Sequence, residues 1–193
     1  MATLFVDKID PQSGTSLEIG SSGDTITIPS GATITNNGTQ TGFGGVNTPA
    51  FEVIKSSTQT VTDGSTTKIT FDTEIFDTAS AYDTSTSKFT VPSGQAGKYF
   101  IYSGLTHTSG TSGQISDCRT VIFKNGSQHK GAFLIFGGTT GSFLSLNTFS
   151  TIDLSVGDYI EIYGLVNVGS GTAQVGGDAS DDRSYFGGYK IIE

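Results

Sequence analysis

The sequence is poor in the residues that would place it in several large classes of protein. It contains one cysteine, Cys118, so no disulfide framework can form within the chain. Lys and Arg number 10 against 18 Asp and Glu, for a formal net charge of −8, and they form no basic stripe that would bind a nucleic-acid backbone. No apolar run approaches the ~20 residues that span a bilayer. We therefore expect neither a nucleic-acid partner nor insertion into a membrane.

Helical patterning is also missing. No window of ten or more residues places apolar residues at helical spacing. The chain instead has 27 glycines and many serines and threonines, a composition that favours strands and tight turns. The sequence therefore predicts an all-β protein. The opening MATLFVDKID has no basic region followed by an apolar core, so we expect no secretory signal and synthesis in a cytoplasm.

Residues 14–38 contain a short repeat of the form Gly-x-x-Leu/Ile-x-Ile. Its copies begin at Gly14, Gly23 and Gly31, and Asn37-Gly38 ends the series. Each copy predicts a short strand of about four residues with one apolar side, after a turn that glycine allows at little steric cost. The apolar positions of the repeat are Leu17, Ile19, Ile26, Ile28 and Ile34.

Such short strands cannot bury their apolar side within one chain, and three copies are too few for a solenoid with a filled core. Two alternatives remain: the copies pack on another body, or three identical chains wind around a common axis and share a core. The repeat resembles the short stalk and attachment segments of tailed-phage fibre proteins. We therefore assign residues 1–40 to an attachment or stalk segment and residues 41–50 to a glycine-rich linker.

From residue 51 the chain changes to longer alternating strands at roughly even spacing. About ten strands without a helical break predict a two-sheet sandwich over residues 51–193, in the form of a ten-strand jelly roll. Residues 68–76 are expected to form one strand, with Ile69 and Phe71 on the same side. Asn125-Gly126, at the end of an alternating run, predicts a hairpin with a type I′ turn.

Three motifs in this region resemble the globular C1q domain, which is related to the tumour-necrosis-factor fold. They are Tyr82-Asp83-x-x-Thr86-x-x-Phe89-x-x-Pro92 with Gly97-x-Tyr99-Phe100, then Leu154-x-x-Gly157-Asp158-x-Ile160-x-Ile162, and finally Phe186-x-Gly188-Tyr189-x-Ile191. Ser87 departs from the pattern, because the family usually carries glycine just before the phenylalanine. The resemblance implies a jelly roll that assembles as a tight homotrimer.

Aromatic residues on the second side of two strands support a trimer independently of the resemblance. Phe100 and Tyr102 lie on the opposite side of their strand from Tyr99 and Ile101, and the strand that follows residue 158 repeats the pattern. A monomeric sandwich needs only one apolar side per strand, so the second side must be covered. Tyrosine suits a subunit interface because it joins apolar area to a polar tip. The expected interface residues are Phe100, Tyr102, Tyr159, Tyr163 and Tyr189.

No motif in the sequence marks a catalytic site. His107 and His129 have no His or Cys partner at metal-ligand spacing, and no Gly-x-Ser-x-Gly elbow is present. A glycosidase would need two acids about 5–10 Å apart, one with a raised pKa. Sandwich edges and polar turns explain the acids of this region more simply; these are Asp72, Glu74, Asp77 and Asp83.

The acidic loop at residues 177–183 offers one candidate metal site. Asp178, Asp181 and Asp182 lie within five residues, and Ca²⁺ takes several oxygen ligands from such loops. The spacing is not that of an EF-hand, and no Glu closes the site. A solvated acidic turn is the simpler interpretation. We expect no cofactor, with Ca²⁺ as the single candidate ion.

These observations favour a non-enzymatic structural protein of a tailed-phage virion, as a trimeric fibre, tail-associated or capsid-surface protein made in the host cytoplasm. The N-terminal segment would bind other virion proteins, and the head would be displayed for host attachment. One alternative is a stand-alone C1q-like module that binds glycan or protein through loops at residues 106–117 and 137–142. Another is a depolymerase of surface polysaccharide.

Overall fold

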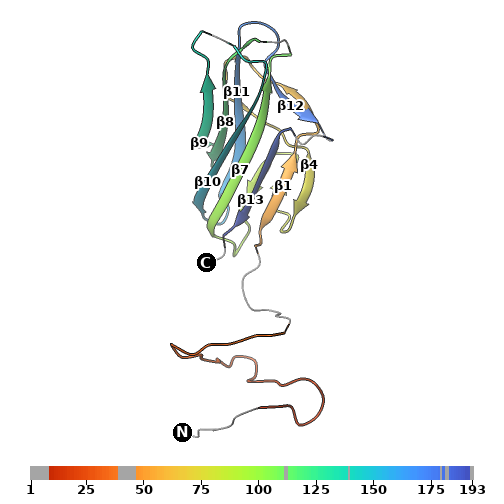
Figure 1. Ribbon diagram of the computed structural model, residues 1–193, viewed down its shortest axis with the longest axis vertical. Coiled ribbons are helices and arrows are strands. Elements are labelled where there is room, and N and C mark those ends of the chain that lie inside the picture. The colour runs from red at the N-terminus through yellow and green to blue at the C-terminus, as the bar shows by residue number, and fades with distance from the viewer. Residues whose placement is uncertain are drawn as a thin grey trace. The chain divides into compact units, whose positions relative to one another are not determined.

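The computed structural model describes residues 9–38, 47–110, 113–138, 140–178, 180 and 183–191. The chain divides into two units, residues 1–43 and residues 44–193. In the described residues the second unit, hereafter the head, contains thirteen strands and no helix (Figure 1). Consequently no described segment is a helix long and apolar enough to cross a membrane.

The first sheet of the head has seven strands, arranged around the long strand β7. One side of β7 pairs with β10 along its whole length, and the other side pairs with β13 and then β12. The strands of this sheet are β1 (Ala50–Ile54), β2 (Ser57–Thr60), β4 (Thr73–Asp77), β7 (Gly97–Thr108), β10 (Phe143–Leu154), β12 (Gln174–Asp178) and β13 (Tyr185–Lys190).

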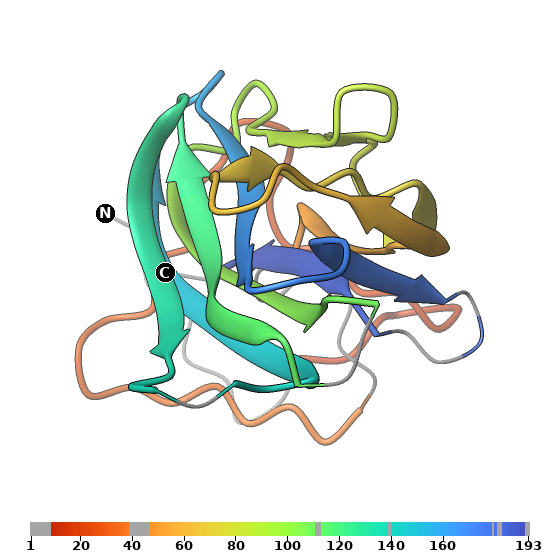
Figure 2. The same cartoon turned by 90° about the horizontal axis from the view of Figure 1, so that it is seen from above.

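The second sheet has six strands, with β11 at its centre and β9 at one edge. These strands are β3 (Thr67–Lys68), β5 (Tyr82–Asp83), β6 (Lys88–Thr90), β8 (Ile115–Lys124), β9 (Ser127–Ile135) and β11 (Tyr159–Val168). Every strand pair in the two sheets is antiparallel. In Figure 2, β9 (teal) is the outermost strand at one margin.

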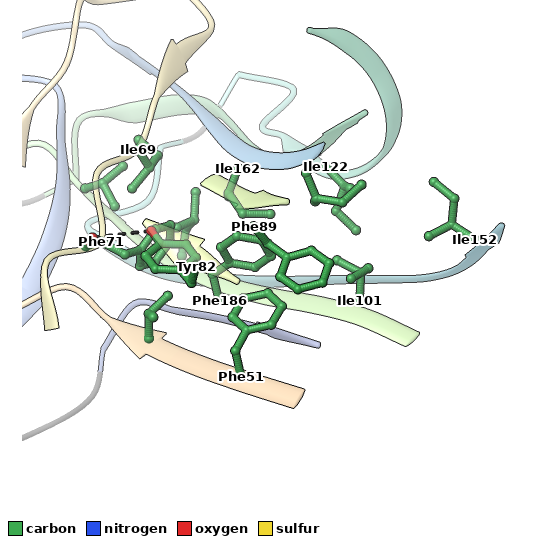
Figure 3. Close-up of a cluster of buried hydrophobic side chains, with 14 of the residues drawn as sticks. Phe51, Ile69, Phe71, Tyr82, Phe89, Ile101, Ile122, Ile152, Ile162 and Phe186 are labelled. Carbon is green, nitrogen blue, oxygen red and sulfur yellow. Dashed lines mark hydrogen bonds between the residues drawn. The ribbon is translucent and has the colours of Figure 1, made fainter. Parts of the chain in front are cut away.

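The core lies between the two sheets and is built around a group of aromatic rings (Figure 3). Phe51 of β1 stacks on Phe89 of β6, with 4.5 Å between ring centroids. Phe186 of β13 meets Phe51 edge-on at 5.0 Å. Because these rings come from both sheets, each sheet presents one apolar side to the other, as expected for a two-layer sandwich. The predicted all-β jelly roll is confirmed.

The strand expected at residues 68–76 is two strands, because the chain changes sheets within it. β3 pairs with β11 of the six-stranded sheet, whereas β4 pairs with β1 of the seven-stranded sheet. Between them, the Ile69 amide donates to Ile162 O at 2.9 Å and the Asp72 amide donates to Ile54 O at 3.2 Å. Local alternation alone does not show where a strand leaves one sheet for the other.

Two turns contain residues in the left-handed backbone conformation that glycine adopts most easily. Asn125 and Gly126 have φ values of 51° and 76°, so the predicted type I′ hairpin between β8 and β9 is confirmed. Ser87, where the C1q family usually carries glycine, has a φ of 48°. The buried Ser87 hydroxyl accepts the Phe71 amide at 3.2 Å, which offsets the strain of a left-handed serine.

The repeat of the N-terminal unit forms turns but not strands. Gly14, Gly23 and Gly31 all have positive φ, between 77° and 95°, as the repeat predicts. No strand occurs in residues 9–38, so the expected short strands are wrong for the single chain, because no neighbouring strand supplies ladder hydrogen bonds. Residues 41–46 of the expected linker lie outside the described residues, and β1 begins at Ala50.

Candidate functional site

The side of β7 that faces away from the core carries aromatic residues. Tyr99 and Ile101 are fully buried in the core, whereas Phe100 and Tyr102 lie on the outer side and are half-buried. This alternation is the one expected from the sequence. The outer side of the seven-stranded sheet is therefore apolar where β7 crosses it.

Neighbouring strands extend this apolar surface. Phe100 lies 5.6 Å from Tyr189 of β13 and 6.1 Å from Phe149 of β10, measured between ring centroids. Tyr102 lies 6.3 Å from Tyr185. Phe149 is 60% exposed, which is high for a phenylalanine in a sheet. The aromatic face, as we name it, comprises Phe76, Phe100, Tyr102, Phe149, Tyr185 and Tyr189.

Two glycines make the aromatic face flat. A Cβ at Gly187 would lie 2.5 Å from the Tyr102 ring, and a Cβ at Gly104 would lie 2.7 Å from the Tyr185 ring. Each tyrosine therefore lies over a backbone that has no side chain beneath the ring. A flat surface of this kind allows another molecule to approach closely, which favours binding by shape.

The tyrosine hydroxyls of this face are held by polar partners from adjacent strands. Tyr102 OH donates to Glu52 Oε2 at 2.7 Å, and Tyr185 OH donates to Asn147 Oδ1 at 3.2 Å. Burial raises the pKa of Tyr102 above its ordinary value, and the bond to Glu52 raises it further. Because these partners fix the rings, the face is preorganised and loses little side-chain freedom on binding.

Tyr159 and Tyr163, also expected at the interface, lie on β11 and therefore on the outer side of the six-stranded sheet. Ile160 and Ile162 are fully buried, so the predicted alternation of β11 is confirmed. The sandwich nevertheless places these two tyrosines on the side opposite Phe100. The five expected interface residues are thus divided, three on one face and two on the other.

Groups of the same chain cover the β11 tyrosines. Lys88 Nζ lies 4.2 Å from the centroid of the Tyr159 ring, and Phe123 stacks on Tyr163 at 4.0 Å. Between them, the buried Glu161 carboxylate lies 2.5 Å from Lys68 Nζ and 3.8 Å from Lys88 Nζ. The part of this face around Tyr159 and Tyr163 is therefore closed by its own stack and ion cluster.

A second exposed apolar surface, which sequence reasoning missed, lies on β9. Phe133 and Ile135 are 70% and 60% exposed, and both pair with outward residues of β8. Leu134, opposite the buried Cys118, is also partly exposed because β9 ends the sheet. The consecutive apolar residues at 132–136 were the available signal, because such a run puts apolar side chains on both sides of a strand.

The edge strands β9 and β10 lie side by side at one margin of the sandwich (Figure 1). His129 Nε2 lies 3.0 Å from Ser150 Oγ, and Lys130 Nζ lies 5.8 Å from the Phe149 ring centroid. Among the described residues β9 pairs only with β8, and β10 pairs only with β7. His129 and Lys130 therefore connect β9 to β10 at this margin, whereas Phe133 and Ile135 lie on the outer side of the six-stranded sheet. We call Phe133, Leu134 and Ile135 the β9 edge.

The acidic loop shows a turn rather than a metal centre in its described part. Asp178 Oδ1 accepts the Ser180 amide at 3.0 Å and the Ser180 hydroxyl at 2.7 Å, and these bonds lower the pKa of Asp178. Arg183 lies 3.6 Å from the same carboxylate. Asp181 and Asp182 lie outside the described residues. Within the described ranges no group of three or more His, Cys, Asp or Glu is placed to hold a metal ion.

The other chemically reactive side chains serve the fold. His107 is buried, with Nε2 3.0 Å from Arg119 O and Nδ1 3.3 Å from Leu144 O. Burial raises the pKa of the Cys118 thiol to about 11, so little of it is thiolate at neutral pH. Hydrogen bonds from Ser85 and Thr86 lower the pKa of Asp83 to about 2, the reverse of what the general acid of a glycosidase needs.

Asp72 and Asp77 also serve turns and links in the head. Asp72 accepts the amide and the hydroxyl of Ser56, each at 2.9 Å. Asp77 accepts the amides of Ala79 and Tyr82 at 3.0 and 2.7 Å. These contacts explain both acids without a catalytic role.

The loop expected at residues 106–117 is shorter than the sequence indicates. β7 continues to Thr108 because it pairs with both β10 and β12 there, and β8 begins at Ile115. Thr106, His107 and Ser109 are buried. Most of this segment is therefore not an exposed binding loop.

Two globular domains are among the solved structures that resemble the head. The globular domain of zebrafish complement 1qA is 16% identical, with a TM-score of 0.50, and the match covers 74% of this chain and 97% of that one. Eiger TNF from S. frugiperda is 11% identical, with a TM-score of 0.54, and the match covers 74% of this chain and 91% of that one. No family model and no curated protein matches the sequence. At these identities the shared property is the fold: the head is a C1q/TNF-like jelly roll.

Proposed function

We propose that the protein is a non-enzymatic, homotrimeric structural component of a tailed-phage virion. The N-terminal segment attaches it to other virion proteins, and the head is displayed, where it serves host attachment. The observation that carries the trimer is the aromatic face, an apolar surface on the outside of a folded sandwich, and the virion role rests on the N-terminal repeat. The C1q/TNF-like fold of the head is consistent with a homotrimer.

The aromatic face has the properties of a subunit interface. Phe76, Phe149 and Tyr189 are between 38% and 60% exposed in the single chain. Contiguous exposed apolar surface mostly marks an interaction site, and aromatic residues with fixed hydroxyls dominate binding energy at such sites. In this proposal, the face is buried against another copy of the head.

Three-fold symmetry requires that each copy bring two different surfaces to the contact. In the described part of the head, exposed large apolar residues gather mainly at two places, the aromatic face and the β9 edge. In this proposal the β9 edge of one copy packs on the aromatic face of the next, because both surfaces are apolar and exposed.

The oligomeric state of designed variants tests the trimer. We expect the wild-type protein to be a trimer by light scattering. Phe76→Asp with Tyr189→Asp damages the aromatic face, and Phe133→Asp with Ile135→Asp damages the β9 edge; each pair should give a folded monomer. Val156→Asp, at a residue that is 53% exposed outside both surfaces, is the matched control and should remain trimeric.

Mixing the two monomeric variants sharpens this test. Each variant retains one intact surface, so a mixture should form a one-to-one dimer through the single intact pair of surfaces. An edge variant that still assembles, or a mixture that stays monomeric, contradicts contact between face and edge. A wild-type head that is monomeric at micromolar concentration contradicts the proposed trimer itself.

The virion role rests on the N-terminal repeat and is tested separately. Its apolar pairs are exposed in the single chain and need a partner. A chain lacking residues 1–48 should keep a trimeric head and fail to join virions. Electron microscopy of virions should show three copies together. Normal incorporation of the truncated chain would contradict attachment through this segment.

A stand-alone C1q-like module that binds glycan or protein is the second candidate, and the fold of the head favours it. Three heads in one assembly would strengthen weak individual binding by avidity. Purified trimers should then adsorb to susceptible cells and compete with infection. Trimers that incorporate into virions without adsorbing would favour a decorating role.

A further inference from the structure

We infer that three copies of residues 9–38 fold on one another into a parallel, in-register stalk whose core is the apolar positions of the repeat. This inference rests on the proposed trimer of heads. It deepens that proposal by naming the partner of the segment, which is the same segment in the other two copies. The strands missing from the single chain would form only in the assembly.

The single chain already has the turns but lacks a partner for its apolar side chains. Gly14, Gly23 and Gly31 adopt the positive φ that the turns require. The second turn is closed by two bonds between Ser21 and Asp24, at 2.7 and 3.0 Å, and the third by the Ala32 amide to Pro29 O at 3.1 Å. The apolar positions of all three copies remain 44–62% exposed. The segment therefore has the required turn conformations and lacks pairing with a neighbouring strand.

The charges of the segment are compatible with burial of its apolar side. Residues 9–38 contain three acids, Asp10, Glu18 and Asp24, and no Lys or Arg. Glu18 lies between Leu17 and Ile19, so in an extended strand its carboxylate points away from the side that those two residues share. Asp24 is held in a turn by Ser21. Three copies can therefore bring their apolar sides together without placing a carboxylate in the core.

The spacing of the repeat favours identical copies over a foreign surface. The apolar pairs recur after nine and then eight residues, from Leu17 to Ile26 to Ile34. Copies in register match this uneven spacing automatically, whereas another protein would have to reproduce it. A trimeric head also holds the three segments at a high effective concentration, so their association becomes intramolecular.

Asn36 occupies the position at which the third copy of the repeat would place its second apolar residue. Its side-chain oxygen accepts the Gly38 amide at 2.9 Å in the single chain. A polar residue at one core position ends the apolar core and opposes shifted registers, which would bury it against isoleucine. The repeat thus specifies register as well as association.

Hydrogen exchange on the full-length protein tests the stalk. In the trimer, amides of residues 17–19 and 26–28 should exchange on the order of 100-fold slower than those of an unstructured chain. Ile26→Asp with Ile28→Asp should remove this protection while the head stays trimeric. Thr25→Asp with Thr27→Asp, on the opposite side of the same strand, is the matched control and should keep it.

The outcomes separate the stalk from the trimer of heads. If light scattering shows a trimer while residues 9–38 exchange at the unstructured rate, the stalk is disproved and the assembled head stands. Protection that survives in the isoleucine variant also disproves it, because the apolar side would then not form the core. A monomeric wild-type protein disproves the proposed function on which the stalk depends.

Discussion

The two outer faces of the head carry similar aromatic residues but differ in what covers them. On the seven-stranded sheet, Tyr102 lies over a glycine and remains open to a partner, together with Phe149 and Tyr189. On the six-stranded sheet, Tyr159 is covered by a lysine and Tyr163 by a phenylalanine. An aromatic residue on the second side of a strand is therefore not by itself evidence of an interface.

A second apolar side of a strand therefore has two uses in this head. The closed part of the six-stranded sheet, around Tyr159 and Tyr163, adds stability to the single head through contacts within the chain, whereas the aromatic face leaves apolar area for another molecule. Mutations on the first should change the free energy of unfolding and leave assembly unchanged. Mutations on the second should do the reverse.

Gly187→Ala should have the largest effect, because it adds a side chain beneath the Tyr102 ring and the aromatic face is then no longer flat. The new Cβ would lie 2.5 Å from the Tyr102 ring, which must then lift out of the surface. We expect the dissociation constant of the trimer to rise about 100-fold, or about 2.7 kcal/mol, because hot-spot aromatics contribute on this scale. Sedimentation at several concentrations measures it.

Gly176→Ala is the matched control for that variant. In the same sheet, a Cβ at Gly176 would meet its nearest neighbouring atom at 3.5 Å, an ordinary contact. This variant should assemble as the wild type does. Equal trimer stability in both alanine variants would show that the flat floor of the aromatic face is irrelevant to assembly.

Glu161→Gln tests the closed part of the six-stranded sheet and should act on stability alone. The buried carboxylate lies beside Lys68 and Lys88, whose side chains are 28% and 34% exposed. Loss of the charge leaves two ammonium groups without their counter-ion, and partial exposure reduces the cost to about 2 kcal/mol. Urea unfolding measures this loss, and light scattering should show an unchanged trimer. An unchanged midpoint would refute the role of the ion cluster.

The sequence predicted which side of each strand faces the core, because alternation is a local property. Ile160 and Ile162 against Tyr159 and Tyr163 show this, since the two isoleucines are fully buried. It did not predict which sheet each strand joins. β7 and β11 have similar patterns, and only pairing between distant segments places them in different sheets. The expected single interface was therefore a mixture of two faces.

The sequence also could not predict which side chains cover the β11 tyrosines. Lys88 reaches Tyr159 because β6 pairs with β11, and Phe123 reaches Tyr163 because β8 does. These are non-local contacts that no spacing in the sequence encodes. In the N-terminal repeat, by contrast, the glycine turns were predicted correctly because they are local, and the strands are absent from the single chain because they need a neighbour.

His107 connects the two sheets, and its protonation should have a smaller effect on stability than the changes above. Its ring lies between Leu144 O of the seven-stranded sheet and Arg119 O of the six-stranded sheet. Burial lowers the pKa of His107 below 6.5, and the two carbonyls oppose this only in part. The unfolded chain therefore takes up a proton below about pH 6.5 that the folded head does not.

Stability should accordingly fall with acid, by about 1.4 kcal/mol per pH unit, from about pH 6.5 down to the lowered pKa of the folded state. Urea unfolding of the wild type and of His107→Gln at pH 7.5, 6.5 and 5.5 measures the difference. The glutamine variant should lose this slope. Parallel pH profiles would show that His107 is protonated as readily in the folded head as in the unfolded chain.

Lys88→Gln should have the smallest effect, and it tests whether cover by a lysine is what distinguishes the two faces. It removes the ammonium group 4.2 Å from the Tyr159 ring and should cost about 0.5–1 kcal/mol of stability. Nitration of Tyr159, read by mass spectrometry, should become faster because the ring is uncovered. We expect no new association, because this face still has the Tyr163 stack and the buried Glu161 rather than a glycine floor. If the variant instead forms larger assemblies than the trimer, then cover by a single lysine, and not the shape of the surface, distinguishes the two faces.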